Sequence, residues 1–142
     1  MTRWLFLPCA VLLCGCNPQS RGFVLPEGNA SRGAEAVEEL ACTQCHSVGD
    51  VAWSGTDDDV EIPLGGATTA RKTYGELLTS IINPSHRISR PYLGEDVAVD
   101  GESKMRRYNE VMSVQQLIDI VTYLETQYTL VTPNNPYRYR AW

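Results

Sequence analysis

The chain has 142 residues, which is the size of one domain, and 43% of them are hydrophobic, enough for an ordinary globular core. Its formal net charge of −5 and the lack of a basic stripe argue against binding to nucleic acid. The sequence shows no internal repeat and no low-complexity stretch. These totals leave a small globular protein whose function has to be inferred from its motifs.

Residues 1–16 have the pattern of a signal for export. The apolar run over residues 4–13 follows a basic start and is too short to span a bilayer. It ends in Leu-Cys-Gly-Cys, with Cys16 last, which resembles the bacterial lipoprotein box. The resemblance implies that Cys16 becomes the lipid-carrying N-terminus. The alternative is an ordinary cleavage nearby that leaves Cys16 free or removes it.

Residues 17–28 are rich in proline and glycine and are predicted to form a tether between the lipid and a folded domain. We therefore expect an exported protein on the periplasmic side of a bacterial membrane, held there by its lipid. Asn17 follows the lipid cysteine, where an aspartate would favour retention at the inner membrane in many Gram-negative bacteria. This favours the outer membrane weakly, and both locations stay open.

The pentapeptide Cys42-Thr43-Gln44-Cys45-His46 is the attachment signature of a c-type haem. Residues three apart lie on one face of a helical turn, so Cys42 and Cys45 can reach the two vinyl groups along one edge of a porphyrin. His46 can then turn its imidazole onto the iron. The motif therefore predicts one covalently bound haem c with His46 as an iron ligand.

Two other sites use paired cysteines. A structural zinc site takes about four protein ligands, and beyond this motif the chain offers His86 and no second Cys-x-x-Cys pair. A thioredoxin-like redox motif needs a βαβ context, and no strand-like alternation flanks this one. The five cysteines are instead accounted for if two leave with the signal, one takes lipid and two take haem.

Three segments carry the apolar periodicity of amphipathic helices. They cover residues 29–45, 73–83 and 113–127. Asn29 or Ser31 can cap the first, which would place the haem motif at its C-terminal end. The second and third open with capping boxes, Thr73-x-x-Glu76 and Ser113-x-x-Gln116. The stretches between the helices are predicted to be loops. Residues 129–142 form a proline-containing aromatic tail, which we expect to pack on the domain surface or else to dock on a partner.

The order of these features resembles that of class I cytochromes c: the haem motif, a methionine far downstream, and then a helix reading Val-Thr-Tyr-Leu. The resemblance covers residues 29–128. It implies an all-α fold of about three main helices around one haem, with the first and last helices crossing at Gly33 and Tyr123. It also implies that the carbonyl of Pro63 accepts the ring N–H of His46. The chain departs from the family's Gly-Pro-x-Leu and Met-Pro forms.

The same resemblance implies that Met105 is the second iron ligand, because it matches the family's methionine in its distance ahead of the final helix. Met112 and His86 are the alternatives. Met112 precedes the Ser113 cap, where it can pair with Leu117 as a hydrophobic staple. His86 comes just after the second helix, where a surface histidine needs no special role.

The resemblance implies a membrane-tethered, single-haem electron carrier without catalytic residues. His46 and Met105 would fill both axial positions, and redox partner proteins of a respiratory chain would supply and accept one electron. One alternative is a dedicated cytochrome subunit of a respiratory oxidase or dehydrogenase complex, which the tether and the tail fit. Another is a haem peroxidase or gas sensor, which would need the methionine to be displaced.

Overall fold

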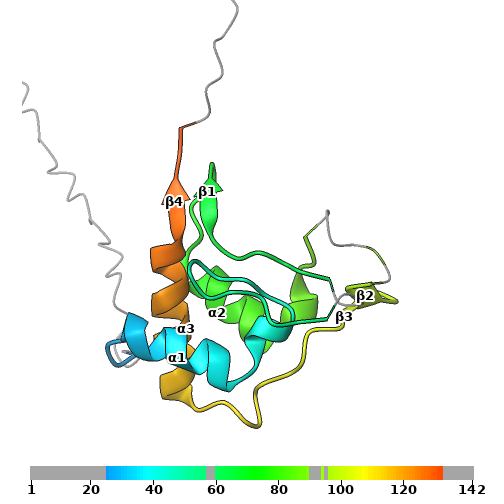
Figure 1. Cartoon of the computed structure of the whole chain (residues 1–142), viewed down its shortest axis with the longest axis horizontal. Helices are drawn as coiled ribbons and strands as arrows, with labels where there is room; N and C mark the ends of the chain where they lie inside the picture. The colour runs from blue at the N-terminus through cyan, green and yellow to red at the C-terminus, as the bar shows by residue number, and fades with distance from the viewer. Residues whose placement is uncertain (1–24, 57–59, 90–93, 95, 133–142) are drawn as a thin grey trace, which may run out of the picture.

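The structure, a computed structural model, describes residues 25–56, 60–89, 94 and 96–132. The expected signal, the lipidation site Cys16 and most of the tail therefore lie outside the described residues. Within them the chain forms three α-helices, α1 (Ala30–Glu39), α2 (Tyr74–Ile82) and α3 (Val114–Gln127). Figure 1 shows α1 crossing α3, with α2 beside them. None of these helices has the length and apolar composition that a bilayer-spanning segment requires.

Side-chain caps fix where the helices begin. The Oδ1 of Asn29 accepts the backbone N–H of Arg32 at 2.9 Å, so Asn29 is the cap of α1. Both predicted capping boxes are confirmed: Thr73 pairs with Glu76 at the start of α2, and Ser113 pairs with Gln116 at the start of α3.

The first helix is shorter than predicted. It ends at Glu39, and Ala41 then adopts a left-handed backbone with φ of 56°. Residues Cys42–Gln44 form a separate 3₁₀ turn after this break. The prediction of one helix over residues 29–45 is therefore wrong in its last part, because a non-glycine residue in the left-handed region leaves no signal in the sequence.

The crossing of α1 and α3 is close enough to exclude a side chain at Gly33. A Cβ atom there would fall on the backbone oxygen of Asp119 and lie 2.7 Å from the Cβ of Tyr123. The expected contact between Gly33 and Tyr123 is thus confirmed. The Tyr123 hydroxyl donates to the carbonyl of Val48 at 2.9 Å, which links the crossing to the segment that follows the cysteine motif.

The prediction of an all-α fold is wrong, because the described part of the chain also contains two short sheets. Strand β1 (Gly66–Thr68) pairs in parallel with β4 (Tyr128–Leu130) directly after α3. Strand β2 (Ala98–Val99) pairs antiparallel with β3 (Glu102–Ser103). Figure 1 shows the two sheets at different ends of the domain. The fold is therefore a mixed one of helices and strands.

These strands were missed because two or three residues cannot show the alternation by which a strand is recognised. One signal was nevertheless present. Asp100-Gly101 lies between β2 and β3, and its φ values of 51° and 81° are the two positive angles that a type I′ hairpin turn requires. An Asp-Gly pair inside a stretch predicted to be a polar loop was the evidence for this hairpin.

A buried carboxylate joins α1 to α3. The Asp119 side chain is 4% exposed and pairs with Arg32 at 2.8 Å. It also accepts the backbone N–H of Asn29 at 2.7 Å and the amide of Gln115 at 2.9 Å. The hydrogen bond from Arg32, together with those from Asn29 and Gln115, lowers the pKa of Asp119 from its usual 3.8 to about 2.

Replacing this carboxylate should destabilise the crossing. We expect Asp119→Asn to lower the melting temperature near neutral pH, because a neutral amide loses the ion pair and presents one acceptor oxygen to these donors. Since the folded pKa is depressed, the stabilisation is fully present above about pH 4 and is lost as the pH falls toward about 2. Melting curves followed by circular dichroism across this range measure the effect.

The difference in melting temperature between the wild type and Asp119→Asn should decrease as the pH falls from about 4 toward about 2. Glu125→Gln, which neutralises an exposed acid on the same helix, is the matched control and should keep its melting temperature near that of the wild type. Equal melting temperatures for Asp119→Asn and wild type near neutral pH would contradict this role of Asp119.

Candidate functional site

The cysteine motif folds into a tight turn that brings its three reactive side chains together. The backbone N–H groups of Cys45 and His46 both donate to the carbonyl of Cys42, at 3.2 and 3.0 Å. Cys42 is half-buried and Cys45 is exposed, and both are free thiols. Burial raises the pKa of the Cys42 thiol. The motif thus presents two thiols and an imidazole from one 3₁₀ turn.

A neighbouring extended segment holds this turn in place. The N–H of Ile62 donates to the carbonyl of Cys45, and the N–H of Leu64 donates to the carbonyl of Ser47, both at 2.8 Å. A parallel bridge between Val48 and Leu64 continues the pairing. These bonds flank His46 on both sides, so the backbone position of the histidine is fixed by residues far along the chain.

The ring of His46 is oriented by a single carbonyl. Its Nδ1 lies 2.9 Å from the backbone oxygen of Ile62. A carbonyl can only accept, so Nδ1 carries the proton and donates. Burial lowers the pKa of His46, although the Ile62 carbonyl opposes that shift. The ring is therefore a neutral imidazole whose Nε2 keeps its lone pair, which is the form that binds metals.

The resemblance assigned this acceptor to Pro63, but the structure places the carbonyl of Ile62 there. Pro63 instead lines the large cavity that is described in the next paragraph. Counting back from Leu64, Ile62 occupies the first position of a Pro-x-Leu stretch. The carbonyl that accepts the His46 ring N–H is therefore predicted better by its position two residues before Leu64 than by the presence of a proline.

A large cavity opens beside the turn. Its volume of about 660 Å³ is within the range of small-molecule and cofactor sites. Cys45, His46 and Met105 line it, and its charged lining residues carry both signs, with Lys72, Arg87 and Lys104 beside Glu76 and Asp96. Its volume and its mixed lining suit a ligand that has both apolar surface and charged groups.

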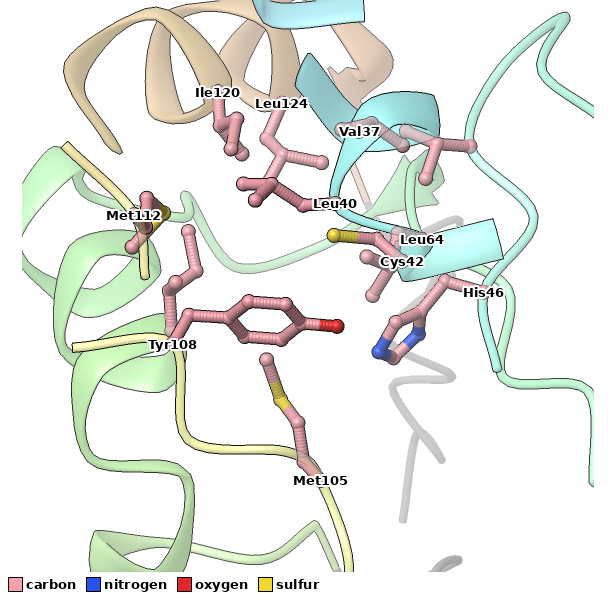
Figure 2. A pocket seen from close by; sticks show the side chains of 12 residues that line it. Val37, Leu40, Cys42, His46, Leu64, Met105, Tyr108, Met112, Ile120 and Leu124 are labelled. Carbon is pink, nitrogen blue, oxygen red and sulfur yellow. The ribbon is translucent and has the colours of Figure 1, made fainter. Parts of the chain in front are cut away.

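A smaller cavity of about 40 Å³ adjoins it, lined by Cys42, His46 and Met105 together with apolar side chains (Figure 2). The residues that border both cavities are His46, Leu64, Ile81, Met105 and Leu124. Figure 2 shows Val37 and Leu40 coming from α1 and its end, with Ile120 and Leu124 coming from α3. The helix crossing thus supplies the apolar wall of the site.

The structure separates the three candidates for the second iron ligand. Met105 borders both cavities, whereas Met112 borders the smaller one and packs against the core. His86 is exposed, borders neither cavity, and has its Nδ1 3.1 Å from the carbonyl of Asn83 in its own turn. The arrangement favours Met105 for the side of the site facing His46.

Tyr108 is a residue of the site that the sequence analysis missed. It is 7% exposed, and burial raises its pKa to about 12, so its hydroxyl is neutral at physiological pH. Figure 2 shows its ring across the smaller cavity, with the hydroxyl end toward Cys42 and His46. Its neighbours Arg106 and Arg107 are exposed. Because charged residues precede it, the local sequence gives no indication that Tyr108 is buried.

These features fit a haem. The two thiols can take the vinyl groups of one porphyrin edge, an imidazole lone pair and a thioether can take the iron, and the walls of the smaller cavity are apolar. Among the described residues, no cluster of three or more His, Cys, Asp or Glu side chains is arranged to hold a bare metal ion.

Substituting the two methionines separately tests the ligand assignment. If the chain carries a covalent haem, Met105→Ala should remove the sulfur-to-iron charge-transfer band and open the iron to carbon monoxide, because the thioether that borders both cavities is lost. Met112→Leu keeps volume and apolar character, so the band should remain and only stability should fall slightly. The reverse pattern would transfer the assignment to Met112.

No protein-family model matches this chain, and no curated protein or solved structure is similar to it at a significant level. The resemblance to class I cytochromes c therefore rests on the sequence motif and on the order of the features around it.

Proposed function

We propose that this chain is a membrane-tethered, single-haem electron carrier that resembles class I cytochromes c in its site and is not itself an enzyme. The observation that supports this most is the meeting of Cys42, Cys45, His46 and Met105 at adjoining cavities, although Met105 is far from the motif in sequence. The Ile62 carbonyl that accepts the ring N–H of His46 and the apolar lining of the smaller cavity support the same function.

Each residue has a distinct role in this proposal. Cys42 and Cys45 would hold a haem through thioether bonds, and the His46 imidazole and the Met105 thioether would bind its iron. The chemistry supplied by a haem held there would be the gain and loss of one electron at its iron. The Ile62 carbonyl fixes the ring of His46 through Nδ1 and increases the basicity of its Nε2. The apolar side chains of the helix crossing keep water away from the site.

The position of Cys45 suggests where electrons would enter and leave. Cys45 is exposed while Cys42 is half-buried, so of the two thioether bonds the one to Cys45 would lie nearer the surface. A redox partner protein could approach there without any substrate reaching the iron. With Met105 as a second iron ligand, the site would favour a carrier over a peroxidase or a gas sensor, because those functions need a coordination position that is free for a substrate or a gas.

Covalent attachment is the direct test. The denatured protein should retain a peroxidase-active haem stain at its own band on a gel, and Cys42→Ala with Cys45→Ala should abolish it because no thioether can form. Gln44→Ala is the matched control, since this exposed side chain lies between the two cysteines and should leave the stain intact. Absence of the stain from the wild type would refute the proposed function.

The tether is tested separately. If Cys16 carries lipid, the wild type should fractionate with membranes and incorporate labelled palmitate, and Cys16→Ser should move it to the soluble fraction. The haem stain should be unchanged in that variant, because Cys16 precedes the folded domain. Membrane association that persists in Cys16→Ser would show that another element holds the protein there.

A further inference from the structure

Tyr108 is buried although it belongs to the irregular segment between β3 and α3. Loops usually run over the surface, and a tyrosine this deeply covered implies a specific contact for its ring and its hydroxyl. Met105 lies three residues earlier on the same segment. The segment that carries the candidate ligand is therefore anchored in the site by an aromatic side chain that the proposed function does not use.

The backbone of Tyr108 is fixed as firmly as its ring. Its carbonyl accepts the N–H groups of Val111 and Met112, at 3.0 and 2.8 Å, just before α3 begins. On the other side, the N–H of Met105 donates to the Oγ of Ser103 at 3.1 Å. Met105 therefore sits between two anchors, one at the end of β3 and one at Tyr108.

The side chain of Tyr108 has contacts on several sides. The Arg106 guanidinium lies 5.6 Å from the ring centroid, which is cation–π geometry. Figure 2 shows the hydroxyl end of the ring directed toward Cys42. Figure 2 shows the Met105 side chain pointing toward the ring, and thioether sulfur makes favourable contacts with aromatic rings. Because a thioether sulfur can only accept, the hydroxyl would be the donor in a hydrogen bond to Cys42 once the thioether has formed.

We propose that Tyr108 is a positioning residue for Met105, its buried ring supporting the thioether and its hydroxyl, directed toward Cys42, holding the ligand-bearing segment beside that cysteine. This inference rests on the proposed function. It assigns Tyr108 no direct bond to the haem iron. Its consequence is that the strength of the sulfur-to-iron bond depends on a residue that does not coordinate the iron.

The test uses the full chain with its haem attached and compares Tyr108→Leu and Tyr108→Phe with the wild type. Two temperatures are measured, one for loss of the sulfur-to-iron band and one for loss of helicity by circular dichroism. Tyr108→Leu should lose the band well before its helices melt. Its carbon monoxide-accessible fraction should rise about tenfold, which corresponds to about 1.4 kcal/mol. Tyr108→Phe retains the ring, so it should show a smaller separation in the same direction.

Tyr74 supplies matched controls, because it is a half-buried tyrosine packed against the core and borders neither cavity. Its hydroxyl is buried without a hydrogen-bond partner in the described part of the chain, so Tyr74→Phe should leave both temperatures close to those of the wild type. Tyr74→Leu should lower both temperatures together, as a purely structural loss does.

The proposal is overturned if both temperatures fall together in the Tyr108 variants, or if carbon monoxide binding stays at the wild-type level. Either result leaves the proposed function standing. If Tyr108→Leu does not fold, Tyr108→Phe decides by the same criterion. If the wild type carries no covalent haem, both the proposed function and this inference are overturned.

Discussion

A hydrogen atom in place of a side chain at Gly33 lets α1 and α3 meet almost backbone to backbone, and the site depends on that approach. The crossing brings Tyr123 against α1, and its hydroxyl reaches the carbonyl of Val48. Val48 in turn bridges to Leu64, close to the Ile62 carbonyl that orients His46. A continuous series of contacts thus connects the helix crossing with the imidazole.

The two sides of the site are held by different means. The His46 side is fixed by backbone hydrogen bonds from the segment around Ile62, which give the ring little freedom. The Met105 side depends on a segment without regular structure, held by Ser103 and by the burial of Tyr108. Side-chain packing of this kind is easier to change by mutation than a backbone pairing.

The sequence was sufficient for features that depend on local chemistry. The Thr73 and Ser113 boxes predicted the starts of α2 and α3, because a capping side chain and its backbone partners lie within one turn. The motif predicted that Cys42, Cys45 and His46 would be neighbours for the same reason. Met105 was placed by resemblance alone, since nothing local connects it to the motif.

Features that depend on contacts between distant segments were missed. The pairing of β1 with β4 joins residues from opposite ends of the domain, and neither strand has a recognisable pattern alone. Ala41 is left-handed because its surroundings require it, not because of its identity. The acceptor for His46 was assigned by residue type, although backbone carbonyls are present at every residue and only the fold selects Ile62.

The parallel pairing of β1 and β4 has a consequence for how the chain acquires its structure. Pairing between segments so far apart costs loop-closure entropy, which is offset only when the intervening elements have already packed. The α3 helix leads directly into β4, so formation of the α1–α3 crossing would deliver β4 to its place beside β1. Because β4 is the last element of the described chain, β1 has no partner strand until the rest of the domain is in place, and this pairing closes the fold last.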